Sequence, residues 1–287
     1  MRYIDLDLLL ADAESQSLIM SADDALQKVL DEPDPAERKK LIDENRDKWV
    51  AFRERFHAVF GQKCWYTESE NPGTDEDVDH YRPKGRIAES RAHGGYWWEA
   101  LSWRNFRLSS HRANRMRINP DTGRTHGKAD HFPLLDEAHR WAGPGYICCE
   151  APTLLDPTDP EDPPLLTFDT NGYTALSTAY RNDPVAHRKV EDSRIYLHLD
   201  WPAFVAARRR LYTLIYTKIA DGDRAVARLV HEPVTAKETL KAIARDLIRL
   251  TRDDQPYSRA AQTYVLHYRD RDWVKRNVVP YVPGGLN

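Results

Sequence analysis

The side chains best suited to chemistry lie near the middle of the 287-residue chain, where an aspartate and a histidine, Asp79 and His80, are neighbours. A carboxylate offers a hard oxygen ligand for a divalent cation, and an imidazole accepts a proton near neutral pH. Two asparagines follow, Asn105 after 25 residues and Asn114 after nine more. Each residue alone could equally be structural, the histidine in a hydrogen bond and the asparagines in turns or helix caps. It is therefore the spacing of the four residues together that indicates a functional site.

The elements around these residues must place them close together. We expect two short extended stretches, near residues 78–82 and 106–109, and the segment SSHRANRMR (109–117) predicts the start of a helix. Asp79 and His80 then lie on the first strand, Asn105 before the second strand and Asn114 on the helix. Two strands and a helix around one metal ion form a ββα-metal arrangement.

Several motifs surround these four residues: CWYTE (64–68), DVDHYRPK (77–84), WWEALSWRN (97–105), SHRAN (110–114), KADHFPL (128–134) and EAPTLLDP (150–157). With these motifs, the chain resembles the HNH nuclease superfamily, and within it the HNH proteins of Septu-type and retron-associated anti-phage systems. The resemblance is strong over about residues 61–172, and the helical tail is similar but less specific.

The resemblance implies a role for each of the four residues. His80 would be the general base that activates water, and Asp79 and Asn114 would hold one divalent metal ion. Oxygen ligands of this kind suit Mg²⁺ or Mn²⁺. Asn105 would brace the loop so that His80 presents the correct nitrogen. His111 could be an extra metal ligand, although a surface or phosphate-facing position is the alternative.

The chain departs from the family at a structural zinc site. The family often has two cysteine pairs there, whereas the corresponding residues here are Cys64, Thr67, Ser110 and Ala113. Because three of four ligands are missing, no structural zinc is expected. Packing must then hold the region together, and the candidate core aromatic residues are Trp65, Tyr66, Trp97, Trp98 and Trp103.

The distribution of charge along the chain favours a phosphate-containing substrate at the motif region. The chain has 42 basic and 45 acidic residues, a net charge of −3, which by itself argues against a general nucleic-acid coat protein. However, residues 80–128 hold 11 Lys and Arg against 3 Asp and Glu, while residues 1–79 hold 10 against 20. Cations near the motif can bind phosphates. The candidate substrate-binding residues are Arg82, Lys84, Arg115 and Lys128. Glu150 and Asp156, in a second family-like motif, could support the metal site or simply cap a Pro-rich loop.

The rest of the chain predicts an α-rich α+β protein, with a small ββα-metal (HNH) core between two helical regions. Apolar residues at helical spacing predict helices at 22–31 and 36–60, and further helices from 186 onward, including separate ones at 202–220 and 222–231. Asn171 and Gly172 predict a hairpin with a two-residue type I′ turn. The expected regions are 1–60 (helical), 61–135 (nuclease core), 136–185 (Pro-rich loop and hairpin) and 186–287 (helical).

The leading hypothesis is therefore a metal-dependent DNA endonuclease that acts in anti-phage defence. By family resemblance its partner would be an ABC/SMC-type ATPase or retron components. The alternatives are a non-catalytic nucleic-acid-binding subunit that keeps an HNH shell, and an RNase toxin that uses the same site. The sequence has no apolar run near the roughly 20 residues of a membrane span, and its acidic start lacks the basic region of a signal peptide. We therefore expect a cytoplasmic protein without a membrane partner.

Overall fold

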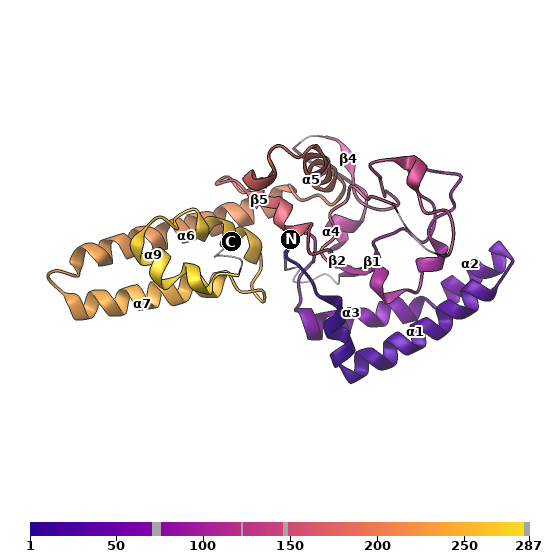
Figure 1. Cartoon of the computed structure of the whole chain (residues 1–287), viewed down its shortest axis with the longest axis horizontal. Coiled ribbons are helices and arrows are strands. Elements are labelled where there is room, and N and C mark those ends of the chain that lie inside the picture. The colour runs from indigo at the N-terminus through magenta and orange to yellow at the C-terminus, as the bar shows by residue number, and fades with distance from the viewer. Residues whose placement is uncertain (71–75, 122, 146–148, 284–287) are drawn as a thin grey trace.

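The computed structural model describes residues 1–70, 76–121, 123–145 and 149–283, and it is rich in helix, as expected for an α-rich α+β chain. Strands within these described ranges form three two-stranded antiparallel sheets. Figure 1 shows an arm of C-terminal helices at one end, the N-terminal helices at the other, and the small sheets between them. None of the helices in the described ranges is both long and apolar enough to cross a membrane.

The N-terminal region is a short 3₁₀ helix, η1 (Leu6–Ala11), followed by α1 (Ala13–Asp31), α2 (Pro35–Glu44) and α3 (Arg46–Phe60). The helix predicted at 22–31 is correct but begins earlier, because the Asp12 carboxylate caps it by accepting a hydrogen bond from the Ser15 backbone N–H. The helix predicted at 36–60 is divided at Asn45, whose side-chain amide donates to the Leu41 carbonyl and closes α2.

Strands β1 (Asp77–His80) and β2 (Phe106–Ser109) pair antiparallel, with Asp79 opposite Arg107 and His80 opposite Phe106. Residues alternate between the two faces of a strand. Val78, Leu108 and Phe106 pack in one apolar cluster with α3, which covers that face of the sheet. The four-residue helix α4 (His111–Asn114) follows β2 directly and is capped by the Ser110 side chain. The expected order of two strands and a helix is therefore present, although α4 is only about one turn long.

The candidate core aromatic residues are buried or partly buried, and they divide among several apolar clusters. Trp65 and Trp103 pack with α1 and α3, and Tyr66 packs with Cys64 and Ala113 on the other side of the sheet. Trp98 belongs to a third cluster, and Trp97 packs against both this cluster and the first. Two of the four positions at which the sequence analysis looked for zinc ligands, Cys64 and Ala113, thus lie in one apolar cluster with Tyr66.

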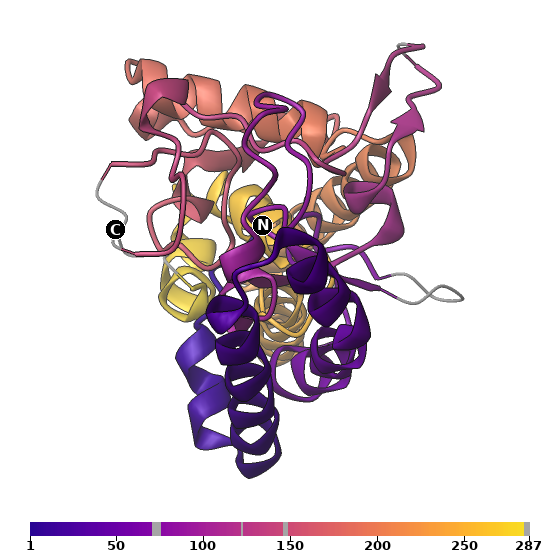
Figure 2. The ribbon, with the colours of Figure 1, turned by 90° about the vertical axis from the view of Figure 1, so that its right-hand side faces the viewer.

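The central loops carry short elements. They are η2 (Trp97–Glu99), η3 (Trp103–Asn105), β3 (Arg117–Ile118), β4 (Thr125–His126), η4 (Glu137–His139), η5 (Pro163–Leu165), β5 (Leu166–Phe168), β6 (Thr174–Leu176) and η6 (Thr178–Tyr180). Figure 2 shows the hairpin of β3 and β4 projecting from the body. The predicted hairpin exists as β5 and β6, but the two-residue type I′ turn was wrong. Five residues connect these strands because the Asp169 carboxylate accepts the Asn171 and Tyr173 N–H groups.

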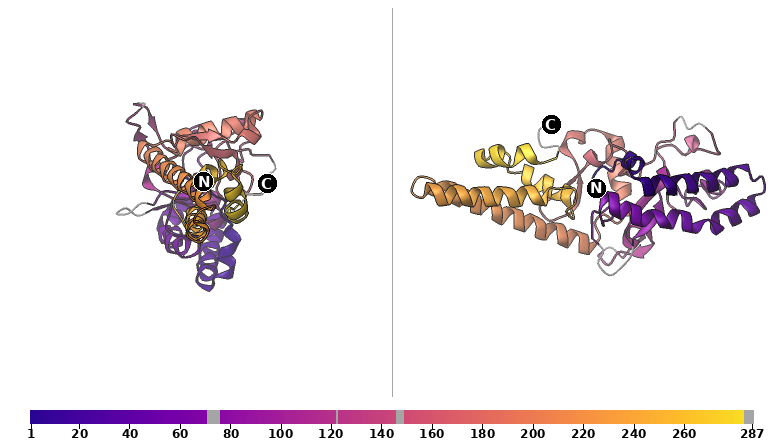
Figure 3. Two further views of the ribbon diagram at one scale, coloured as in Figure 1. Left: turned by 90° about the vertical axis from the view of Figure 1, so that its left-hand side faces the viewer. Right: turned by 90° about the horizontal axis from the view of Figure 1, so that it is seen from below.

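The C-terminal region contains α5 (Pro184–Tyr196), α6 (Pro202–Arg228), α7 (Pro233–Leu250), α8 (Ser258–Leu266), α9 (Asp272–Asn277) and η7 (Val279–Tyr281). Figure 3 shows the long α6–α7 pair extending away from the N-terminal helices. The two helices predicted at 202–220 and 222–231 are one helix, α6. Gly222 lies inside this helix, and a Cβ at this position would lie 2.2 Å from the Trp273 ring, so the glycine permits close packing.

Candidate functional site

A polar cavity of about 360 Å³ runs along β1, between α3 and the end of α4. His80 and Asn114 both line it, so the structure brings these two sequence-predicted residues to one site. The basic residues of the wall are Arg46, Arg53, Lys84 and Arg115, and the acidic ones are Glu76 and Asp77. The excess of cations makes this cavity a suitable place for a phosphate group.

The His80 ring is held in one orientation. Its Nε2 atom lies 2.8 Å from the carbonyl oxygen of Ala100, and a carbonyl can only accept, so Nε2 carries the proton and Nδ1 keeps its lone pair. Trp49 and Phe106 contact the ring edge-to-face, with centroids 5.2 Å away in each case. Burial lowers the pKa of His80 to about 3, and the nearby Lys84 and Lys128 contribute to the shift. His80 is therefore neutral at physiological pH, with a lone pair on Nδ1.

Asn114 lies beside a carboxylate that the sequence analysis did not single out, that of Asp77. Asn114 Nδ2 donates to Asp77 Oδ2 over 3.0 Å, and His111 Nε2 lies 3.2 Å from Asp77 Oδ1. The Arg115 guanidinium also contacts both carboxylate oxygens. The structure thus gathers a carboxylate, a carboxamide and an imidazole, of which Asp77 and Asn114 line the cavity.

Asp79 faces a different environment from the one expected for a metal ligand. Its side chain is buried, Oδ1 accepts a hydrogen bond from Lys128 Nζ (2.9 Å), and Oδ2 accepts one from the Tyr66 hydroxyl (2.8 Å). Among the described residues that line the cavity, Asp79 is absent and Asp77 is present. Lys128 also donates to the His80 carbonyl and is fully buried, so in this structure it neutralises Asp79 instead of meeting a phosphate.

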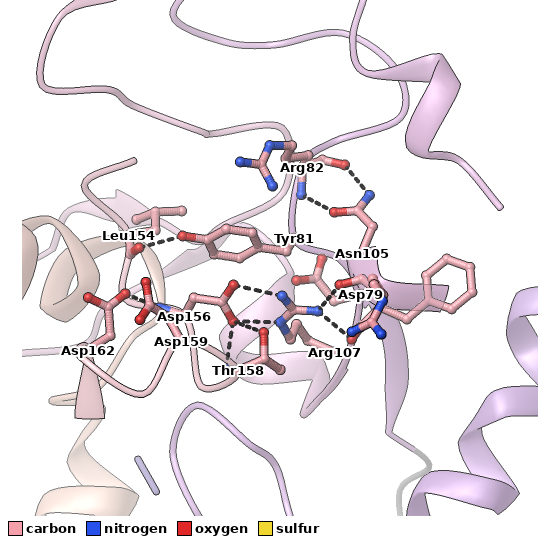
Figure 4. A network of polar contacts seen from close by, with 12 residues as sticks. Asp79, Tyr81, Arg82, Asn105, Arg107, Leu154, Asp156, Thr158, Asp159 and Asp162 are labelled. Atoms are coloured by element: carbon pink, nitrogen blue, oxygen red, sulfur yellow. Dashed lines mark hydrogen bonds and ion pairs between the residues drawn. The ribbon is translucent and has the colours of Figure 1, made fainter. Parts of the chain in front are cut away.

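Asn105 ties the loop after β1 to the segment before β2. Its Oδ1 accepts the Arg82 backbone N–H (2.8 Å), and its Nδ2 donates to the Arg82 and Glu99 carbonyls (2.9 and 3.2 Å). Figure 4 shows its carboxamide turned to the Arg82 backbone. The side chain is buried and its polar atoms are used, so Asn105 holds backbone and is not placed to bind a metal ion.

The other predicted substrate-binding and supporting residues are placed as follows. Lys84 lines the cavity, with Nζ 5.0 Å from the centre of the Trp49 ring. The Arg82 side chain instead donates to Glu150 over 2.8 Å. Glu150 is buried and also accepts from the Tyr96 hydroxyl and the Trp141 backbone N–H, so it anchors loops.

Asp156 also belongs to the supporting structure behind the sheet. Its carboxylate forms a bidentate ion pair with Arg107 on β2, with both contacts at 2.7 Å. It accepts a further bond from the Thr158 backbone N–H, and Figure 4 shows this network beside Tyr81. Asp156 therefore positions the strand opposite Asp79 and is directed to Arg107, not to the cavity.

Sequence reasoning missed Asp77, Glu76 and the α3 residues Arg46 and Arg53. A signal for Asp77 was available, because the D-x-D-H pattern contains two carboxylates that share one face of a strand. The arginines offered no such signal, since charged residues between the apolar positions of a helix usually face solvent.

The side chains at Asp77 are of types that can ligate a divalent cation, a carboxylate, a carboxamide and an imidazole. As the site stands, the Asp77 carboxylate accepts a hydrogen bond from Asn114 Nδ2 over 3.0 Å, and His111 Nε2 lies 3.2 Å from it. A cation would bind the Asp77 carboxylate, a His111 ring nitrogen and Asn114 Oδ1, not the Nδ2 atom that now donates. In the described ranges no cluster of three or more His, Cys, Asp or Glu side chains is suited to a metal ion. The set at Asp77 has two such residues, Asp77 and His111, and a third ligand would come from Asn114 Oδ1.

Comparison with known proteins gives one informative similarity. No family model matches the chain, and no solved structure matches it. The chain is 32% identical over 119 residues to Septu protein PtuB from Bacillus mycoides (strain KBAB4). The match covers 40% of this chain and 37% of the relative, so the chain spans less than two fifths of that relative's length. The similarity links part of this chain to a Septu protein.

Proposed function

We propose that this protein is a metal-dependent HNH endonuclease that hydrolyses the phosphodiester bonds of DNA. The observation that carries the proposal is the cavity along β1. It is lined by the neutral His80, by Asn114, whose carboxamide oxygen can ligate a metal ion, and by four cationic side chains. A proton acceptor, hard donors and phosphate-binding cations are the three components that such a hydrolysis requires.

His80 is the general base of the proposed reaction. Because the Ala100 carbonyl holds the proton on Nε2, Nδ1 is the atom that accepts a proton from the attacking water. Asn105 supports this geometry by holding both the loop after β1 and the Glu99 carbonyl, which is next to Ala100 in the chain. In this proposal Lys84 and Arg115, which line the same cavity, bind phosphates of the substrate.

Asp77, Asn114 and His111 are the residues that would hold Mg²⁺ or Mn²⁺. The bound cation would stabilise negative charge on the phosphate and on the leaving oxygen. Arg115, which now contacts Asp77, would be released to bind the substrate when a cation takes its place at the carboxylate. We assign the carboxylate ligand to Asp77 in place of Asp79, because Asp77 is among the described residues that line the cavity, whereas Asp79 is buried in an ion pair with the fully buried Lys128.

We further propose that the protein acts in anti-phage defence with an ABC/SMC-type ATPase. The similarity to a Septu protein supports a defence role, and the family resemblance of the motifs supports the ATPase. Co-expression with an ATPase encoded beside this gene tests the partnership, and stable co-elution of the two proteins is the expected result. Elution of this chain alone, under conditions in which both proteins are folded, would contradict it.

The experiment that tests the catalytic proposal compares substrates. Plasmid DNA and single-stranded RNA are incubated with the purified protein, alone and with the ATPase, in Mg²⁺, Mn²⁺ or EDTA. DNA nicking that EDTA abolishes is expected. Retardation of DNA with steep salt dependence and no cleavage would favour a non-catalytic binding subunit, and cleavage of RNA alone would favour an RNase.

A further inference from the structure

A second cavity, of about 470 Å³, lies between α2 and the loop that follows β1. Lys84 lines both this cavity and the one that contains His80. The two cavities are therefore neighbours on the surface, connected through a single cationic side chain. A polynucleotide that enters the first cavity has an adjacent space in which a neighbouring unit can bind.

The wall of the second cavity carries stacked planar groups. The Arg38 guanidinium carbon lies 4.0 Å from the centre of the Trp97 ring, and both side chains line the space. A guanidinium on an indole presents a flat, cationic surface, which is a favourable stacking platform for a nucleobase. Arg38 Nε is buried and has no hydrogen-bond partner in the described part of the chain.

The glycines of the wall leave room for a ligand. Gly85 and Gly94 both line the cavity, and a Cβ at either position would meet no atom within 4 Å. The His93 ring is fixed nearby, because its Nε2 lies 2.7 Å from the Trp141 carbonyl oxygen. The cavity thus combines a rigid aromatic side with an open backbone side.

The charge of the cavity favours an anion. Its cationic residues are Arg38, Lys39, Lys84 and Arg86, and its acidic residue is Asp43. Asp43 is engaged by Lys39 at 2.9 Å, and Arg86 contacts Asp130 at 2.6 Å. Arg38 forms no ion pair within the described residues, so it supplies positive charge that these acids do not neutralise, and Lys84 lies within electrostatic range of Asp43.

We infer that the second cavity binds one nucleotide, with its base stacked on the Arg38–Trp97 pair and its phosphate held by Lys84. The inference rests on the proposed nuclease function, because Lys84 places this nucleotide next to the scissile phosphate. A nucleotide of the substrate strand and a free nucleotide both have a planar base and a phosphate, so either could bind here. The test therefore measures binding of a DNA strand and of free nucleotides separately.

Binding is measured without divalent metal, so that cleavage does not enter the result. The probes are a fluorescein-labelled 12-nucleotide DNA strand, the same strand with abasic sites, and free dAMP or ATP as competitors. The variants of the full chain are Arg38→Ala and Arg38→Lys, and Arg249→Ala on α7 is the control with the same charge change. Arg38 is on a helix and only partly buried, and alanine favours helix, so the variant should fold.

We expect Arg38→Ala to weaken binding of the normal strand about tenfold, the effect of losing one stacked base, and Arg249→Ala to leave it unchanged. Arg38→Lys should lose less affinity than Arg38→Ala but should not reach wild type. The affinity for the abasic strand should be the same in wild type and Arg38→Ala. If free nucleotides bind and depend on Arg38 while the strand does not, the site takes free nucleotides. The inference would be overturned if wild type and Arg38→Ala had the same affinity for the normal strand and the same affinity for free nucleotides. Full recovery of the affinity in Arg38→Lys would also overturn it. A protein that shows the Arg38 effect but never cleaves DNA would retain this site and refute the nuclease proposal.

Discussion

The Nε2 atom of His80 donates to the carbonyl oxygen of Ala100 over 2.8 Å, while the ring contacts Trp49 and Phe106 edge-to-face. This enclosure favours the neutral ring. It lowers the pKa of His80 to about 3, whereas a histidine in the unfolded chain has a pKa of about 6.5.

The first prediction concerns stability against pH. The unfolded state takes up a proton on His80 below about pH 6.5 and the folded state does not, so stability is lost as the pH falls toward 3. Between pH 7 and pH 5 this residue should lower the free energy of unfolding by about 2 kcal/mol. Urea denaturation of wild type and His80→Gln at both pH values measures the difference. An identical pH dependence in the two proteins would show that His80 titrates normally.

Lys128 should be needed mainly for stability. Replacing it with methionine removes the ammonium group from the fully buried contact with Asp79. Loss of one partner of a buried ion pair costs about 3–5 kcal/mol, and urea denaturation measures it. The double variant Asp79→Asn with Lys128→Met should recover part of the loss. A loss below about 1 kcal/mol in the single variant would mean that Lys128 is not committed to this pair.

Asp77 and Asp79 provide a matched pair for testing the metal site. Asp77→Asn should weaken Mn²⁺ binding by at least about tenfold, since even residues that only support metal ligands contribute this much. Asp79→Asn should leave Mn²⁺ affinity nearly unchanged. Isothermal titration calorimetry of both variants gives the comparison. The reverse order would show that Asp79 leaves Lys128 and binds the metal ion.

Asn105 should be sensitive to the loss of its amide hydrogens. Asn105→Asp retains an acceptor for the Arg82 N–H but removes both donors, to the Arg82 and Glu99 carbonyls. Each unsatisfied buried group costs about 1–3 kcal/mol, so we expect a marked fall in stability. DNA cleavage, assayed at a temperature where the variant is folded, should fall as well because the His80 loop is no longer held. Unchanged cleavage by the folded variant would show that Asn105 does not position His80 for the reaction.

The local pattern of the sequence predicted much of the fold around the site. The second strand was predicted at 106–109 and lies there, and the first lies at 77–80, close to the expected 78–82. The alternation of residues and the helix caps are local signals, so a single sequence contains them. The close approach of Trp273 leaves no room for a side chain at position 222 of α6, and Trp273 is 51 residues away and has no local signal.

The same distinction applies to the candidate site. Residue type and spacing indicated His80, Asn105 and Asn114, and the structure gives each a defined contact. The choice between Asp77 and Asp79 depends on Lys128, which comes 49 residues after Asp79 and fills its buried surroundings. The ion pair of Arg82 with Glu150 joins residues 68 positions apart. Long-range pairings of this kind decide which charges remain available, and spacing alone does not reveal them.

The central claim is that His80 activates water in a metal-dependent cleavage of DNA. The most direct measurement is the rate of plasmid nicking in Mn²⁺ by wild type, by His80→Ala and by His187→Ala, each with the proposed ATPase partner. His187 is a suitable control because its Nε2 also contacts a backbone carbonyl, that of Arg181, on an exposed part of α5 far from the cavity in sequence. The account predicts that His80→Ala binds DNA like wild type but loses nicking by at least about a hundredfold, while His187→Ala nicks normally. Equal nicking by His80→Ala and wild type would contradict it.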